Sequence, residues 1–384
     1  MSQLGGAGGA GGAGGAGGAG GAGGAGGAGG AGGSFIGTMA DAYAKSIMVD
    51  ARIHGREGTT VPDYPPHCYE PAQRLIGDPI EMERWEAWVR AYTAVGEMLQ
   101  GISFQLTGPP AAPTGFQVAS PTYVIAKIER PQQATFAAQI PMVLSWAELR
   151  NERATEIMAQ IDPQYAFWSS IVYLHPDRTR RTFELINILL QFCVYVEMRF
   201  KHALACYRPV EYNAQVQPMI TTPGHGTFPM GHATQAYAVA HMLKALLNLD
   251  PNPIVPPPKY ALVIEQLQRQ AARITTNRVI AGVHFPVDSM AGRMLGTALA
   301  EYFVARCLTL DNGTGADPTL SRTFLAAGID GPAATTDFNP FDAAQSLDVA
   351  GPLYGRAAGG AITPSGIMRH VWGEAHDEWV GRFP

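Results

Sequence analysis

Two stretches of the chain place cations and a histidine where a small anion could bind. Lys201 and Arg208 are seven residues apart, which puts them on one face of a helix, two turns apart. Further on, Gly231 and His232 lie where a glycine- and proline-rich loop gives way to apolar residues at helical spacing. The first N–H groups of such a helix have no partner inside it and carry the positive end of its dipole. The sequence therefore predicts an anion site at this helix start, with His232 as a candidate acid or base.

A third stretch adds a cation, a second histidine and a carboxylate. Arg278 is followed by His284, and Asp288 comes four residues after that histidine. Asp288 can reach back to the imidazole of His284, which would fix its tautomer and raise its basicity. Together with Lys201 and Arg208, Arg278 gives three positive charges, one compact and two planar and forked. These residue types suit a tetrahedral oxyanion, with one histidine attacking or ligating its central atom and the other moving a proton.

The elements that must position these residues are predicted to be helices. Apolar residues recur at helical spacing in a long segment, 178–206, which ends before Pro209 because proline disfavours helix in the preceding residue. Similar patterns predict helices at 81–100, 139–159, 163–174, 232–249, 259–276 and 286–308, with short helical pieces at 321–327 and 366–372. Residues 118–128 are predicted to be a short hairpin element or a loop, and 277–285 a compact turn. Clean two-residue alternation is nearly absent, so the predicted fold class is all-α, a helical bundle.

Three regions of different composition predict the domain organisation. Residues 1–33 end in nine Gly-Gly-Ala triplets and two glycines, which predicts a flexible tail without bulky side chains to bury. Residues 34–310 are predicted to form one helical catalytic domain that contains the three stretches between 201 and 288. Residues 311–384 are predicted to be an irregular C-terminal extension packed on that domain.

Composition excludes several classes of function. The formal net charge is -5 and only 15% of the 384 residues are charged, which argues against nucleic acid as a partner. The longest apolar run, 185–196, is too short and too interrupted to span a bilayer. The N-terminus lacks a basic and an apolar segment of a signal peptide, so a cytoplasmic location is predicted. The widely spaced cysteines predict buried thiols rather than a zinc site: Cys68, Cys193, Cys206 and Cys307.

Taken together, the three stretches resemble a known signature. They are similar to the three-part motif of the vanadium-dependent haloperoxidases and the related acid phosphatases of the type 2 phosphatidic acid phosphatase superfamily: Lys201-x6-Arg208-Pro209, Pro229-x-Gly231-His232 and Arg278-x5-His284-x3-Asp288. Any one part is weak evidence, but all three in the family order are highly specific. The helical surroundings from about 80 to 308 match the family's helical core in outline.

The resemblance implies a role for each motif residue. His232 would be the acid-base residue, and Asp288 would orient His284. In a haloperoxidase His284 would be the axial vanadium ligand, whereas in a phosphatase it would be the phosphorylated nucleophile. The residues that would hold the oxyanion are Lys201, Arg208, Arg278 and the backbone N–H of Gly231.

The sequence leaves two chemistries open. His225, seven residues before His232, resembles a histidine beside the vanadate site of the algal bromoperoxidases, whereas the segment around Gly282 also looks like the acid phosphatases. The favoured hypothesis is a haloperoxidase that binds vanadate and takes halide and hydrogen peroxide as substrates. The alternative is a phosphatase without a cofactor that hydrolyses phosphomonoesters through a phosphohistidine at His284.

Two positions depart from the family pattern. Met230 stands where the family usually has serine, and losing one such donor costs on the order of 10²-fold in rate. Asn277 replaces another serine but can still donate a hydrogen bond. A third hypothesis is therefore a catalytically impaired oxyanion-binding protein.

The apolar stripe of 81–100 would serve either a homodimer interface or the protein's own core.

Overall fold

The computed structural model describes five segments of the chain: 46–60, 72–161, 164–249, 260–308 and 320–382. The predicted Gly-Gly-Ala tail, the proline-rich segment 251–258 and Cys68 lie outside these residues. The chain divides into two compact units, and the division falls between Arg90 and Ala91, within helix α5 (Ala87–Leu99). The N-terminal unit contains α4 (Ser46–Thr59) and the short helix η2 (Pro79–Arg84). Every candidate site residue belongs to the other unit, which is called the main unit below.

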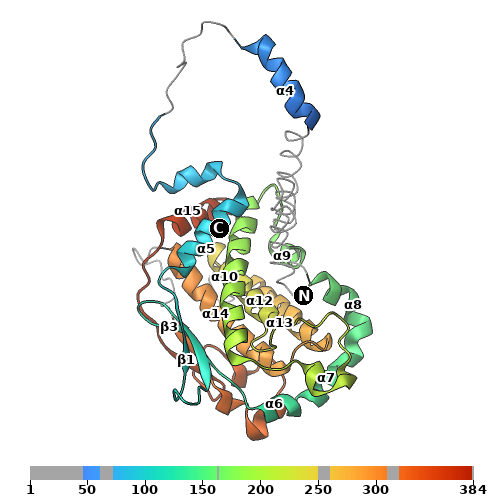
Figure 1. Ribbon diagram of the computed structural model, residues 1–384. Helices are drawn as coiled ribbons and strands as arrows, with labels where there is room; N and C mark the ends of the chain where they lie inside the picture. The colour runs from blue at the N-terminus through green and yellow to red at the C-terminus, as the bar shows by residue number, and fades with distance from the viewer. Residues whose placement is uncertain (1–45, 61–71, 162–163, 250–259, 309–319, 383–384) are drawn as a thin grey trace. The chain divides into compact units, whose positions relative to one another are not determined.

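Four long helices form the centre of the main unit: α10 (Arg180–Leu204), α12 (Gly231–Leu246), α13 (Ala261–Ile280) and α14 (Pro286–Cys307). Helix α12 packs against the other three, and Figure 1 shows the four running through the middle of this unit. The first ten residues of α12 are all buried, as expected for a helix that is apolar or small-sided all round. The predicted helices at 178–206, 232–249 and 286–308 are confirmed. The start of α12 thus lies in the core, where an anion site would be shielded from water.

Two glycines allow α14 to approach α12 closely. A Cβ on Gly296 would lie 2.1 Å from the carbonyl oxygen of Thr234, and one on Gly292 would lie 2.6 Å from that of Met230. The N–H of Met230 also donates to the carbonyl of Asp288 at 3.0 Å. This contact holds the beginning of α12 beside the beginning of α14, and so brings the second and third motifs together.

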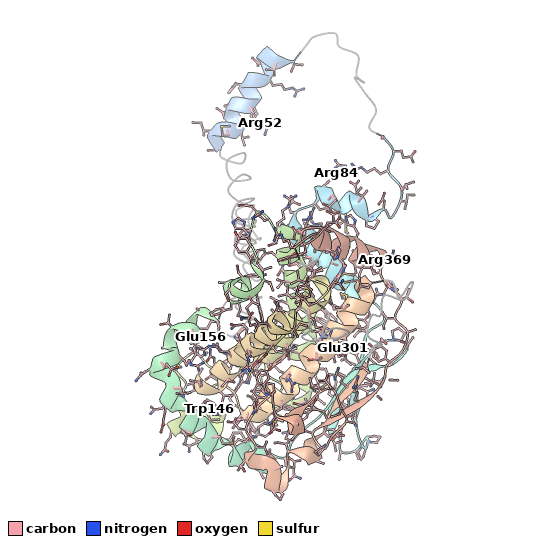
Figure 2. The ribbon with its side chains drawn as sticks, turned by 180° about the vertical axis from the view of Figure 1, so that it is seen from behind. Arg52, Arg84, Trp146, Glu156, Glu301 and Arg369 are labelled. Carbon is pink, nitrogen blue, oxygen red and sulfur yellow. The ribbon has the colours of Figure 1, made fainter. Side chains whose placement is uncertain are left out.

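Shorter helices surround this centre. The predicted helix at 139–159 is two helices, α7 (Ile140–Trp146) and α8 (Arg150–Ala159), joined by η3 (Ala147–Leu149). Figure 2 labels Trp146 on α7 and Glu156 on α8. The others are α6 (Gln133–Ala138), α9 (Tyr165–Val172), α11 (Pro209–Tyr212), η4 (Ala214–Val216), η5 (Ala326–Gly328), η6 (Gly331–Thr335), η7 (Ala343–Gln345) and α15 (Gly366–Asp377). Among the described residues, no helix combines the length and hydropathy that crossing a bilayer would require.

The prediction of an all-α fold is wrong, because the main unit contains a five-stranded mixed sheet. Its strands, in spatial order, are β1 (Ser103–Thr107), β2 (Gly115–Ala119), β3 (Val124–Glu129), β4 (Leu320–Phe324) and β5 (Tyr354–Ala358). All neighbours are antiparallel except β3 and β4, which are parallel. The segment 118–128, left open as hairpin or loop, supplies the last two residues of β2 and all of β3 but its last residue. The predicted helical piece at 321–327 is instead most of β4 and the start of η5.

The strands were missed because they are short and paired over long distances. In β3, Ala126 and Ile128 are buried while Lys127 and Glu129 are only partly covered, so the alternation lasts four residues. Its partner in β4 lies far away in the sequence, with Ala126 opposite Arg322. Such pairing leaves no local trace in the chain.

The buried face of the sheet supports the loop before α12. The ring of Phe116 in β2 lies 5.1 Å from that of Phe200 in α10, and Phe324 in β4 lies 5.6 Å from Phe228. Phe228 directly precedes Pro229, at the start of the second motif. The described cysteines are buried free thiols, as predicted: Cys193, Cys206 and Cys307.

Candidate functional site

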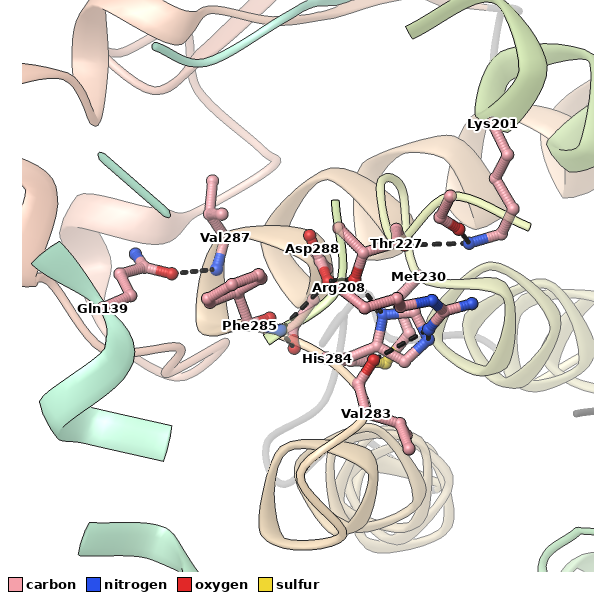
Figure 3. Close-up of polar contacts among 12 residues, drawn as sticks. Gln139, Lys201, Arg208, Thr227, Met230, Val283, His284, Phe285, Val287 and Asp288 are labelled. Atoms are coloured by element: carbon pink, nitrogen blue, oxygen red, sulfur yellow. Dashed lines mark hydrogen bonds and ion pairs between the residues drawn. The ribbon is translucent and has the colours of Figure 1, made fainter. Parts of the chain in front are cut away.

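The best-defined part of the site is a buried pair between His284 and Asp288 (Figure 3). Nδ1 of His284 lies 2.8 Å from Oδ2 of Asp288, and neither side chain is more than 3% exposed. The same oxygen accepts the hydroxyl of Thr227 in a short hydrogen bond and the N–H of Phe285 at 3.0 Å. The second bond is the one an acidic residue in the first turn of a helix makes to the residue that caps it. The start of α14 and the loop before α12 thus fix the carboxylate from two sides.

These contacts determine the tautomer of His284. A carboxylate only accepts hydrogen bonds, so Nδ1 carries the hydrogen and Nε2 keeps its lone pair. Nη1 of Arg208, which can only donate, lies 3.0 Å from Nε2. Burial lowers the pKa of His284 well below its ordinary value, and the charges of Arg208 and Lys201 act in the same direction. His284 is therefore a neutral imidazole at neutral pH, with Nε2 available as a ligand or nucleophile.

Arg208, from the first motif, contacts the third motif and the loop that precedes the second. Besides His284, its guanidinium donates to the carbonyl of Val283 at 2.7 Å and to that of His225 at 3.1 Å. Nη2 also lies 3.1 Å from Nδ1 of His225. Burial lowers the pKa of Arg208 to about 10, so it stays cationic at neutral pH. A buried guanidinium that contacts two histidines is a strong local positive charge.

Arg278 and His232 lie together and share a partner that the sequence reasoning missed. Gln160, at the end of α8, accepts from Nε2 of His232 through its backbone carbonyl at 3.0 Å. Its side-chain oxygen lies 3.4 Å from Nη2 of Arg278, which also donates to the carbonyl of Ile157 at 2.8 Å. Since a carbonyl only accepts, Nε2 of His232 carries the hydrogen and Nδ1 has the lone pair. Burial and then Arg278 lower the pKa of His232 well below its ordinary value.

His284, from the first group of contacts, and Arg278 with His232, from the second, line the same cavity of about 150 Å³. It is lined by Ile161, Ile220, Thr221, Pro223, His232, Arg278, Val283 and His284. The buried Nε of Arg278 has no hydrogen-bond partner among the residues that the structure describes. Burial lowers the pKa of Arg278 to about 9, which leaves it charged at neutral pH. The cavity therefore joins an imidazole lone pair, a second histidine and a cation with an unused donor.

A second and larger cavity, of about 400 Å³, is lined by Arg208. Its lining includes Arg208, Pro223 and His225, and of these Pro223 also lines the smaller cavity. Nε2 of His225 is buried and has no partner in the described segments. Burial lowers the pKa of this histidine to about 4, and Lys201 and Arg208 act in the same direction. His225 thus contacts the site through Arg208. It does not line the cavity that His284 lines.

Lys201 stands further from the cavity than the sequence suggests. Its ammonium donates to the carbonyls of Thr227 at 2.8 Å and Gly226 at 3.2 Å, and it lines neither cavity. Burial and Arg208 lower the pKa of Lys201 to about 7, while Glu197 and Asp288 act in the opposite direction. Lys201 reaches the site through the loop that carries Thr227, and its charge depends on pH near neutrality.

The remaining predicted residues surround the start of α12 and the end of α13. Gly231 is the first residue of α12, so its N–H has no acceptor within the helix. Met230, where the family has serine, is fully buried, and Figure 3 draws it beside the contacts of Arg208 and His284. Asn277 donates to the side chain of Gln160 at 2.9 Å and not into the cavity. This hydrogen bond helps to fix the position of Gln160, which contacts both Arg278 and His232.

Two residues of the site, Thr227 and Gln160, were not found by sequence reasoning. Thr227 lies inside the loop that precedes His232, so its position was a usable signal for a residue near the site. Gln160 comes from α8, more than a hundred residues before Arg278. Nothing in the local pattern around Gln160 distinguishes it from a solvent-exposed glutamine at a helix end.

Comparison with known proteins points to the same family. The VCPO second helical-bundle domain matches residues 208–313, a range that contains every motif residue except Lys201. A vanadium-dependent bromoperoxidase from Ascophyllum nodosum is 30% identical over 94 residues, which cover 20% of this chain and 17% of that enzyme. The chain thus corresponds to a small part of the length of this curated relative. The family model and this relative both support a relationship of the chain, through residues 208–313, to the vanadium-dependent haloperoxidases.

Proposed function

We propose that this protein is a vanadium-dependent haloperoxidase-like enzyme, which oxidises halide with hydrogen peroxide at a vanadate held by His284. The observation that carries the proposal is the lone pair on Nε2 of His284, a neutral imidazole held by Asp288 at the edge of a cavity with Arg278. A neutral imidazole whose other nitrogen donates to a carboxylate is the usual form of a histidine metal ligand. The similarity to a bromoperoxidase favours vanadate over a phosphate ester as the guest.

The residues present fit a tetrahedral oxyanion. The unpartnered Nε–H of Arg278 is a charged donor whose hydrogen bond an oxyanion would satisfy. Arg208 adds a second guanidinium, and the cavity of about 150 Å³ accommodates a small anion. Met230 supplies no hydrogen bond where the family has a hydroxyl, so the two arginines and the start of α12 would make most of the polar contacts.

Each residue then has a definite task. Vanadate, when bound, supplies an electron-poor centre that activates hydrogen peroxide toward halide. Nε2 of His284 would hold the anion, while Asp288 and Thr227 keep the ring in place. Because Nε2 has a single lone pair, Nη1 of Arg208 would have to leave that nitrogen and could donate to the anion instead.

Protons are handled on the opposite side of the cavity. His232 donates through Nε2 to Gln160, so its Nδ1 is the atom that can take and return a proton. Apart from Thr221, the rest of the cavity lining is apolar, which lowers the polarity around a bound anion. His225 acts indirectly, by orienting Arg208.

The test is peroxide-dependent bromination of a dye by protein loaded with vanadate. We expect bromination that requires vanadate and is abolished in His284→Ala, whereas His202→Ala, an exposed histidine on α10, should behave as the wild type. Hydrolysis of p-nitrophenyl phosphate that vanadate inhibits, without any bromination, would contradict the proposal in favour of a phosphatase. If neither activity is seen, Met230→Ser separates an impaired enzyme, which gains turnover, from an oxyanion-binding protein, which does not.

A further inference from the structure

Glu197 is a buried carboxylate that belongs to none of the three motifs. It lies on α10, one helical turn before Lys201, and is only 1% exposed. Its Oε1 accepts a hydrogen bond from Nε2 of Gln235 on α12 at 3.0 Å. Its Oε2 is buried and has no hydrogen-bond partner within the described part of the chain. A buried carboxylate with an unused oxygen is costly unless it serves a purpose.

The carboxyl group lies against the first residue of α12. A Cβ built on Gly231 would be 2.6 Å from Oε1 of Glu197 and 3.1 Å from its Cδ. Glycine at this position therefore makes room for the glutamate. Since the start of α12 is also where an oxyanion would gain from the helix dipole, Glu197 and the oxyanion interact with the same positive end.

The charges around Glu197 place its titration near neutral pH. Burial raises the pKa of Glu197 to about 7, against the attraction of Lys201 and the hydrogen bond from Gln235. Lys201 itself titrates at about 7. The thiol of Cys193 on α10 also lies near Glu197; its pKa lies well above its ordinary value and it stays neutral. Lys201 in addition interacts with Arg208, Asp288 and Cys206. Gln235 and Gly231, which face Glu197 from α12, are uncharged.

Burial disfavours the charged form of both groups, so it favours a neutral glutamic acid at Glu197 and a neutral amine at Lys201. Below their shared titration range the glutamic acid is neutral and the ammonium charged, so the pair carries one positive charge. Above it the carboxylate is charged and the amine neutral, so the pair carries one negative charge. An anion bound nearby favours the first of these states.

We propose that Glu197 is a positioning residue of the anion site, which forms with Lys201 a buried pair that takes up protons when a tetrahedral oxyanion binds. The proposal rests on the oxyanion site of the proposed function but not on the reaction performed there. It gives the site an affinity that falls with pH more steeply than the titration of Lys201 alone would produce. Without the glutamate, the lysine would be the only member of the pair that could take up a proton.

The test compares wild type with Glu197→Gln in binding tungstate, a tetrahedral dianion that does not itself titrate near neutral pH. Isothermal titration calorimetry at about pH 6 and about pH 8 gives the four dissociation constants. We expect the ratio of the wild-type constant to the variant's to rise about tenfold between the two pH values, the equivalent of one pKa unit. Glu184→Gln, which removes a buried carboxylate elsewhere on α10, is the matched control and should leave the wild-type pH dependence unchanged.

A measurement on the wild type keeps the proposal testable if the variant does not fold. Titrations near pH 8 in two buffers of different ionisation enthalpy give the number of protons taken up with tungstate. Uptake of more than one proton is expected, since Lys201 alone accounts for one at most. A pH-independent ratio, or uptake of one proton or fewer, would overturn the role of Glu197 and leave the oxyanion site intact. Failure of wild type to bind tungstate at either pH would overturn both.

Discussion

At the scale of single residues, the site depends on one oxygen atom. Oδ2 of Asp288 accepts from His284, Thr227 and Phe285, and so joins the imidazole to the loop before α12 and to the start of α14. Burial raises the pKa of Asp288 to about 6, against the hydrogen bonds from Thr227 and Phe285 and the charges of Lys201 and Arg208. The carboxylate is thus ionised at neutral pH and increases the basicity of Nε2 on the far side of the ring.

Replacing Asp288 with asparagine keeps the shape of the side chain but removes this charge. We expect Asp288→Asn to weaken vanadate binding by about 10- to 100-fold, the usual cost of losing the carboxylate behind a histidine ligand. Asp337→Asn is the control, since Asp337 is half-buried and accepts from Trp146 away from the site. Equal dissociation constants for Asp288→Asn and wild type, measured by titration calorimetry, would show that the carboxylate only caps α14.

At the scale of elements, the crossing of α12 and α14 positions the second and third motifs. The crossing requires glycine at 292 and 296, because a side chain at either position would meet the backbone of α12. The same crossing sets Met230 against Asp288. Fold stability and site geometry therefore depend on the same two positions.

Gly296→Ala should consequently be destabilising although alanine is a better helix former. Its Cβ would lie 2.1 Å from a backbone oxygen, so the helices must separate, at a cost of about 1–3 kcal/mol. Gly373→Ala in α15, where a Cβ meets nothing within 4 Å, should instead stabilise by about 0.5–1 kcal/mol. Urea unfolding of the two variants measures both values. A stabilised Gly296→Ala would contradict the close crossing.

The contact between α8 and α13 gives a pH-dependent prediction. Arg273 on α13 pairs with Glu156 on α8 at 2.7 Å, and Glu156 also accepts from Gln160 at 3.0 Å. Burial raises the pKa of Glu156, but Arg273, Asn277 and Gln160 together hold it below its ordinary value. The folded state therefore binds this proton less tightly than the unfolded state, and the stability that Glu156 contributes is lost as the pH falls.

We expect Glu156→Gln to lower the free energy of unfolding by about 0.5 kcal/mol at neutral pH, a small value because Arg273 is half exposed. The difference from wild type should vanish once the pH falls below the ordinary glutamate pKa of 4.5 and through the lower folded value. Urea titrations at neutral and acid pH test this, with the exposed Glu152→Gln as control. A difference that grows toward acid pH would mean that the pair does not stabilise α8.

At the scale of the whole molecule, the sequence predicts the helical centre but not the sheet. Long segments with a 3.6-residue period, such as 178–206 and 286–308, gave α10 and α14 to within a few residues. The boundary at 277 was wrong, because α13 continues to Ile280 and carries Arg278 on its last turn. Strands of five or six residues that pair across the whole chain, as β3 and β4 do, have no comparable local signal.

The site residues likewise divide into those that the sequence predicts and those that it does not. The motif residues Arg208, His232, Arg278, His284 and Asp288 were identified from spacing, and the structure places them around or beside one cavity. Gln160 was not identified, because it meets Arg278 only through the packing of α8 on α13. The position of Lys201 behind Thr227 likewise depends on the path of a loop that spacing does not determine.

The central claim is that Nε2 of His284 bonds a tetrahedral oxyanion between two buried arginines. The most direct test is a crystal structure of the protein soaked with vanadate. The account predicts vanadium bonded to Nε2 of His284, with Arg278 donating to it and with Nη1 of Arg208 moved from that nitrogen to an oxygen of the anion. Vanadate bound elsewhere, or an Arg208 that still donates to Nε2 at saturating vanadate, would contradict it.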